Sequence, residues 1–254
     1  MNDNHSDTSS KQDNVPDNES RYTWCNDKAE VIAFFKDMLK KSNTFKNEYD
    51  LLESLKKEAE DGDPMMQDMY GNCLSVGFGC EENPHEAMKW WTRAAKQGSD
   101  SAQFTLAHKY YNGYYTRKNY KKAVYWLEKS AYQGNNEAQG LLGYCYHRGH
   151  GVKKNYKTAV FWYSTALNCG NTDIEAELGF MYYRGLGVRK NYKKAFELML
   201  KGAEGGNPDA MFYVGVCYAN GQGVKKNWNE AIIWWREAAA LGQEKAIDFL
   251  KDLK

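Results

Sequence analysis

A 36-residue repeat runs through most of this chain. The strings VGFGCEENPHEA, NGYYTRKNYKKA, RGHGVKKNYKTA, RGLGVRKNYKKA and NGQGVKKNWNEA begin at Val76, Asn112, Arg148, Arg184 and Asn220, with no insertion between them. A fixed period of 20–50 residues is typical of arrays in which each unit packs only on its neighbours. The period therefore predicts one continuous elongated unit, although 254 residues would otherwise suggest one or two globular domains.

Each repeat has the pattern of two helices joined by a glycine loop. Capping residues precede the first helix at Asp63, Ser99, Asn135, Asn171 and Asn207, and the second at Asn83, Asn119, Asn155, Asn191 and Asn227. Such side chains accept a hydrogen bond from a free N–H of the first turn, worth about 1 kcal/mol. Glycine recurs in the loop and after the second helix, where a left-handed C-cap is favoured. The pattern predicts an all-α stack of antiparallel helix pairs.

The middle of the first helix has a small residue in every repeat. The column is Gly71, Ala107, Gly143, Gly179 and Gly215. Glycine inside a helix costs about 1 kcal/mol relative to alanine, so its recurrence predicts that another chain segment approaches closely. The expected facing residues are the alanines of the second helix, Ala87, Ala123, Ala159, Ala195 and Ala231.

The 36-residue period divides the chain into four parts. Residues 1–22 are polar and acidic and are expected to form a disordered tail. Residues 23–62 are expected to form a degenerate helix pair, 63–242 the five repeats and 243–254 a polar capping helix. The N-terminus lacks the apolar stretch of a secretory signal, and Cys73, Cys145 and Cys217 share one packing position. We therefore expect buried free thiols and a cytoplasmic protein.

Eight or more columns of the repeat resemble a known family. The pattern A-x-x-x-L-G-x-x-Y-x-x-G-x-G-V-x-x-[ND]-x-x-x-A-x-x-W-x-x-x-A-A-x-x-G is similar to the Sel-one-like repeat (SLR) family, which is related to the tetratricopeptide repeats. Residues 138–170 and 210–242 fit it nearly throughout. The resemblance implies a right-handed α-solenoid. The absence of catalytic spacing, together with repeating aromatic and arginine columns, favours a monomeric, non-enzymatic scaffold without cofactor or metal, which binds a protein or peptide rather than nucleic acid or membrane.

The candidate partner site is the side of the first helices opposite their core face. In the related tetratricopeptide arrays this side lines a concave groove. A turn of 100° per residue predicts exposed rings and arginines there, the side chains that a bound peptide or helix would need. The candidate residues are Phe104, His108, Tyr111, Asn112, Tyr144, His147, Arg148, Phe180, Tyr183, Arg184, Phe212 and Asn220. The alternative is that some of these rings pack against adjacent repeats.

Two other functions were weighed. Arg117–Lys118, Lys153–Lys154, Arg189–Lys190 and Lys225–Lys226 recur once per repeat and predict a basic ridge that could bind anions or nucleic acid, although a solvated edge gives the same pattern. Cysteine-rich relatives described as penicillin-binding suggest a β-lactamase-like hydrolase. Its S-x-x-K motif has one match, Ser54–Lys57, without the partner motifs K-T-G or S-D-N. The histidines show no zinc-ligand spacing.

Overall fold

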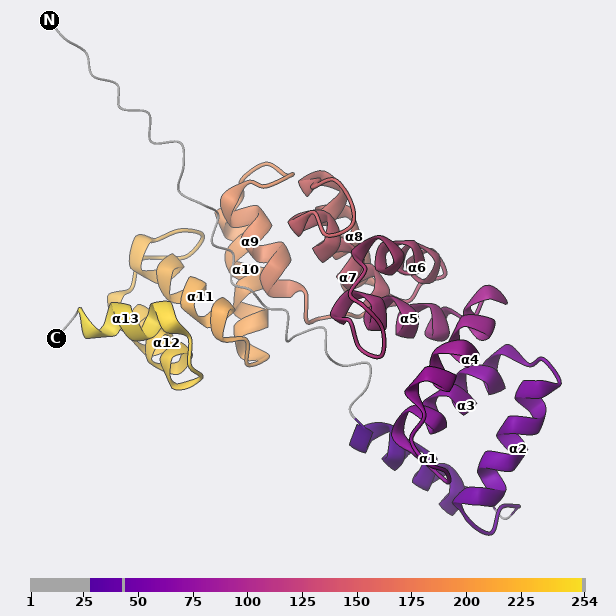
Figure 1. The fold of residues 1–254 in the computed structure, drawn as a ribbon. Helices are drawn as coiled ribbons and strands as arrows, with labels where there is room; N and C mark the ends of the chain where they lie inside the picture. The colour runs from indigo at the N-terminus through magenta and orange to yellow at the C-terminus, as the bar shows by residue number, and fades with distance from the viewer. Residues whose placement is uncertain (1–27, 43, 253–254) are drawn as a thin grey trace, which may run out of the picture.

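The fold is a row of helix pairs, as the repeat predicts. The computed structural model describes residues 28–42 and 44–252, which contain thirteen helices and no strand. The pairs are stacked in a curved row from α1 to α13, and most connections between them are short (Figure 1). The helices are α1 Lys28–Lys41, α2 Glu48–Glu60, α3 Pro64–Val76, α4 Pro84–Lys96, α5 Asp100–Asn112, α6 Tyr120–Tyr132, α7 Asn136–Arg148, α8 Tyr156–Asn168, α9 Glu175–Arg184, α10 Tyr192–Glu204, α11 Pro208–Asn220, α12 Trp228–Ala240 and α13 Glu244–Lys251.

The predicted caps start the second helices. All five asparagines at these positions accept a hydrogen bond in the first turn; Asn119 Oδ1, for example, accepts from Lys122 N at 3.0 Å. The loop glycines end the first helices in the left-handed conformation, with φ between 69° and 82°. These local signals fix the length of each helix, so the 36-residue period becomes a constant helix-pair geometry.

One predicted cap is wrong. The helix α9 begins at Glu175 rather than directly after Asn171, and no side chain caps it. Asn171 instead accepts from Asp173 N at 3.2 Å and donates its amide to Asn136 O at 3.1 Å. The Asn171 and Ile174 side chains lie over Gly140 in α7, where a Cβ would be 3.0 Å from the Asn171 amide and 3.2 Å from Ile174.

Stacking of consecutive helices forms the core. Each helix packs mainly on the one before and the one after it, and α1 also contacts α3. Three clusters of buried apolar residues follow one another along the row, joined at residues such as Tyr110, Trp126 and Leu186. The stability of each pair therefore depends on its neighbours, as expected of a repeat array.

The atoms nearest to the mid-helix glycines belong mainly to large side chains rather than to the predicted alanines. A Cβ on Gly71 would lie 2.8 Å from the indole of Trp91, and one on Gly143 would lie 2.7 Å from the ring of Tyr163. At Gly179 the nearest atom is Met199 Cγ, at 2.9 Å, and Ala195 O follows at 3.2 Å. The glycines thus leave room for a large side chain twenty residues later.

The two ends of the chain can be compared with the predicted division into tail, degenerate helix pair and capping helix. The expected disordered tail, residues 1–22, lies outside the described residues. The helices α1 and α2 lie where the degenerate pair is expected, and α13 lies in the expected capping region, although these boundaries stay predictions. None of the helices that the structure describes is long and apolar enough to cross a membrane.

Candidate functional site

The twelve predicted partner-binding residues lie on four first helices. The helix α5 holds Phe104, His108, Tyr111 and Asn112; α7 holds Tyr144, His147 and Arg148; α9 holds Phe180, Tyr183 and Arg184; α11 holds Phe212 and Asn220. In Figure 1, α5 and α7 lie on the inner side of the curved row, and α6 and α8 lie on its outer side. Each of these four first helices therefore carries two to four of the predicted residues.

The predicted exposure of these residues is wrong for half of them. Six are buried: Phe104, His108, Tyr111, Tyr144, His147 and Phe180. Burial extends around most of each first helix, because every residue from Ala102 to Lys109 in α5 and from Ala138 to Cys145 in α7 is buried. A first helix packs on the second helix of its own pair and on that of the preceding pair, so little of its circumference reaches solvent.

Two of the predicted rings connect a repeat to the loop of the next one. Tyr111 Oη lies 2.9 Å from His150 Nδ1, and His150 stacks on Tyr120 with ring centroids 4.5 Å apart. Two repeats later, Tyr183 Oη donates to Gln222 Oε1 at 2.8 Å. In these two places the predicted residues therefore have a structural role, which agrees with the alternative weighed for them.

Four polar residues form a row that is less buried. Asn112, Arg148, Arg184 and Asn220 are the last residues of α5, α7, α9 and α11. Arg184 and Asn220 are exposed, and the other two are half-buried. The Asn112 amide lies 2.9 Å from His108 Nε2, and Arg148 Nε donates to Tyr144 Oη at 3.2 Å. We call these four residues the inner polar row.

The predicted basic ridge is present and is exposed throughout. We call it the basic loop edge; its residues are Arg117, Lys118, Lys121, Lys122, Lys153, Lys154, Lys157, Arg189, Lys190, Lys193, Lys194, Lys225 and Lys226. None of them forms an ion pair with an acidic residue that the structure describes. Lys118, Lys154 and Lys190 each lie over the tyrosine two residues later, at 5.6, 5.7 and 5.6 Å from the ring centroid.

An outer aromatic patch was missed from the sequence. Tyr125 and Tyr132 on α6 are 52% and 78% exposed, and Phe161 on α8 is 59% exposed. Tyr132 and Phe161 are connected through Trp162, whose ring meets theirs at centroid distances of 5.3 and 5.1 Å, and Tyr125 meets the ring of Trp126 at 4.9 Å. The sequence contains a signal for this patch, because the equivalent positions in two later repeats, Phe161 and Ile233, are also apolar.

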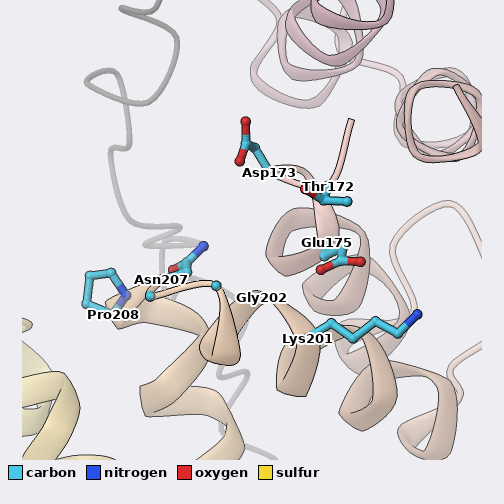
Figure 2. A pocket seen from close by; sticks show the side chains of 9 residues that line it. Thr172, Asp173, Glu175, Lys201, Gly202, Asn207 and Pro208 are labelled. Atoms are coloured by element: carbon cyan, nitrogen blue, oxygen red, sulfur yellow. The ribbon is translucent and has the colours of Figure 1, made fainter. Parts of the chain in front are cut away.

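A cavity of about 420 Å³ lies between the start of α9 and the α10–α11 turn. Figure 2 shows Asp173, Glu175 and Lys201 around it, and Asn207 and Pro208 at the start of α11. Burial raises the pKa of Glu175, and Lys201 opposes the effect. The late start of α9 creates this opening, so the 36-residue pattern could not predict it.

The residues of the hydrolase alternative do not form a recognisable catalytic site. Ser54 and Lys57 lie on α2, where Ser54 Oγ contacts Glu58 Oε1 at 3.4 Å and Lys57 is exposed. The prediction of buried free thiols is confirmed for Cys73, Cys145 and Cys217, and burial raises their pKa. Within residues 28–42 and 44–252, no three His, Cys, Asp or Glu residues are placed to hold a metal ion.

Comparisons with known proteins give one consistent picture. The family model described as Sel1 repeat matches residues 64–99, 100–135, 136–171, 175–207 and 208–243. The crystal structure of a Sel1 repeat protein from Oxalobacter formigenes is 31% identical, with a TM-score of 0.73 over 88% of this chain and 86% of that chain. Comparison with curated proteins gives no match.

A second solved structure is similar over most of this chain. It is a protective antigen of uropathogenic Escherichia coli that displays an SLR fold, with 29% identity and a TM-score of 0.76. The match covers 89% of this chain but 48% of the antigen, so the chain spans about half the length of that protein. The fourth matched segment begins at residue 175, where α9 begins.

Proposed function

The chain belongs to the Sel1 repeat family, and on that premise we propose that it is a non-enzymatic scaffold that holds a partner protein along its first helices. Sel1 repeat proteins generally mediate protein–protein interaction. The finer part of the proposal is the surface. We place the partner segment along the inner polar row, with Tyr183 and Phe212 beside it and the buried rings beneath it as support.

One observation carries this choice of surface. The inner polar row gives one hydrogen-bonding side chain in each of the last four repeats, always at the last residue of the first helix, whereas the first repeat has Val76 there. A partner segment that follows the row would meet amide and guanidinium donors in register with the repeats. Arginine offers several donors in a fixed geometry and binds carboxylates and carbonyl oxygens well. Half-buried rings next to such donors are typical of binding hot spots.

The test compares two baits with added negative charge. The first carries Arg184→Glu and Asn220→Glu, both at exposed residues of the inner polar row. The matched control carries Lys40→Glu and Lys96→Glu, which are exposed at the ends of α1 and α4. We expect that the wild type and the control retain at least one protein from a lysate of the native cell. The first bait should retain at least tenfold less of that protein, as measured by quantitative mass spectrometry.

Binding of the identified protein is then measured by calorimetry with all three purified chains, whose melting temperatures are compared first. The proposal predicts a large rise in Kd for the first variant and an unchanged Kd for the control. Equal retention and equal Kd for all three chains would show that the inner polar row is not the binding surface.

A further inference from the structure

The basic loop edge is the most strongly charged surface that the structure describes. The four segments that carry it, 113–122, 149–158, 185–194 and 221–230, contain thirteen Lys and Arg residues and a single acidic residue, Glu230. The whole chain has a net charge of +1, so this concentration is local. Like charges lined up on one edge repel each other, and a bound anionic group relieves that repulsion.

The geometry holds several of these charges in a repeating pattern. Lys118, Lys154 and Lys190 lie over rings of their own repeats at nearly the same distance. A cation–π contact positions an ammonium group but leaves its charge available. The first residue of each basic pair, such as Lys153, has no ring contact and extends into solvent. In three of its four loops the edge thus offers one cation held over a ring and one without a ring contact to a chain running along it.

The described chain starts beside this edge. Lys28, the first described residue, forms an ion pair with Glu82 at 2.6 Å, and Glu82 belongs to the loop of the first repeat. The charges of both residues act on the pKa of Tyr115, which burial mainly raises. Tyr115 is two residues before Arg117, the first cation of the basic loop edge. Lys28 therefore lies next to one end of the edge.

We infer that the acidic segment 1–27 of this chain docks along the basic loop edge. The segment has six acidic and two basic residues, a net charge of −4. Fully extended, 27 residues reach up to about 90 Å. The three steps between four loops span roughly 55 Å if each step equals two helix spacings of about 9 Å, so the segment is long enough.

This occupant is favoured over nucleic acid because it is covalently attached next to the surface. Attachment gives the segment a high effective concentration at the edge. Exposed ion pairs are individually weak and are screened by salt, so the docked segment stays displaceable. An acidic partner would then have to compete with it. The inference is independent of the inner polar row.

The first test is zero-length carboxyl–amine cross-linking of the full chain at low salt, followed by peptide mass spectrometry. We expect links from Asp13, Asp17 or Glu19 mainly to lysines of the basic loop edge. We expect fewer of these links at 0.5 M salt, where the Debye length is about 4 Å, than at 0.01 M salt, where it is about 30 Å. Links mainly to other exposed lysines such as Lys96 and Lys201, links to Lys109, or an even spread would overturn the inference.

A matched pair of variants checks the cross-linking result. The edge variant carries Arg117→Glu, Lys153→Glu, Arg189→Glu and Lys225→Glu, all at exposed positions without a ring contact. The control reverses four exposed charges elsewhere: Lys40, Lys57, Lys96 and Arg236. Both should keep the helical content and melting behaviour of the wild type. The edge variant should lose the links and the control should keep them; retention by both contradicts the docking.

A polyanion probe gives an independent measurement in the full chain. A labelled 20-nucleotide single strand is titrated against wild type and against a variant with Asp3, Asp7, Asp13, Asp17 and Glu19 changed to their amides. If the segment covers the edge, its neutralisation should tighten DNA binding roughly threefold or more, because apparent affinity falls with the occupied fraction. An unchanged Kd would show that the segment does not cover the edge.

Discussion

The indole of Trp235 lies directly over Gly215. A Cβ at position 215 would lie 2.5 Å from Trp235 Nε1, closer than side chains in proteins approach one another. The same nitrogen donates to Phe212 O at 3.1 Å, which locks the ring in place. Repeat two has the complementary solution, with Ala107 in the glycine column and Leu127 in place of the ring. A larger residue in the glycine column is therefore matched by a smaller residue twenty positions later.

Gly215→Ala is expected to destabilise the array by about 1–3 kcal/mol. Alanine improves helix propensity by about 1 kcal/mol, but overpacking against a locked indole outweighs that gain. Adding Trp235→Leu, which copies the Ala107–Leu127 pair, should recover part of the loss. Chemical denaturation of the two single variants and the double variant measures the coupling.

The control is Gly205→Ala. A Cβ at Gly205 meets backbone oxygens at 3.4 and 3.5 Å, which is ordinary contact, and its φ of −74° suits alanine. This variant should therefore be neutral or slightly stabilising. If Gly215→Ala unfolds at the same denaturant concentration as Gly205→Ala, packing of the Trp235 ring does not require glycine at position 215.

Cys169→Gln is expected to stabilise the third repeat by about 1 kcal/mol. In the first two repeats, Gln97 and Gln133 donate to the buried amide oxygens of Gln67 and Gln103 at 2.8 and 2.9 Å. The next pair would be Gln139 with residue 169. Among the described residues Gln139 Oε1 is buried without a hydrogen-bond partner, because Cys169 cannot reach it.

The glutamine should restore this bond, since Cys169 has nearly the same C-cap backbone as Gln133. Cys169→Leu is similar in size to glutamine but has no donor, and it should bring no gain. The melting temperatures of the two variants decide the matter. An equal rise in both would attribute the effect to packing rather than to the amide.

The repeat predicts the fold because its signals are local. The cap at Asn119 and the C-cap at Gly113 each act within a few residues, so the sequence alone locates them. The cap at Asn171 fails in a turn that packs on Gly140, thirty-one residues earlier. A contact over that distance is not visible in the periodic pattern of a single repeat.

The partner site is predicted less well, for a related reason. A helical wheel gives the side of α5 on which His108 lies, but not whether a neighbouring repeat covers that side. His108 and Tyr111 are covered because rings such as Tyr114, Tyr144 and His150 lie against them. The basic loop edge was predicted correctly because loop residues between helix ends have few neighbours to cover them.

Tyr183→Phe is expected to destabilise the junction between α9 and the loop that follows α11 by about 1 kcal/mol or more. The change removes the 2.8 Å hydrogen bond and leaves the half-buried Gln222 oxygen without its donor. Adding Gln222→Leu, the residue found at Leu186 in the preceding loop, should cancel most of the loss. Hydrogen exchange of the 221–226 amides and thermal unfolding test both expectations; no difference between the single and double variants would contradict them.

Asp68 is expected to make the stability of the array fall as pH rises from about 4 to about 6. Burial in α3 raises its pKa from 3.8 to about 6, Asp100 adds to the shift, and a hydrogen bond from Ser101 opposes it. In that range the folded chain keeps a proton that the unfolded chain has released, so the free energy of unfolding decreases with pH. Asp68→Asn removes the buried charge. It should therefore match the wild type near pH 4 and exceed its stability at pH 8, by at most about 3 kcal/mol at 1.36 kcal/mol per unit of pKa. Denaturant titrations of both chains at pH 4, 6 and 8 measure the difference; a gap that stays constant with pH would show that Asp68 does not titrate in this range.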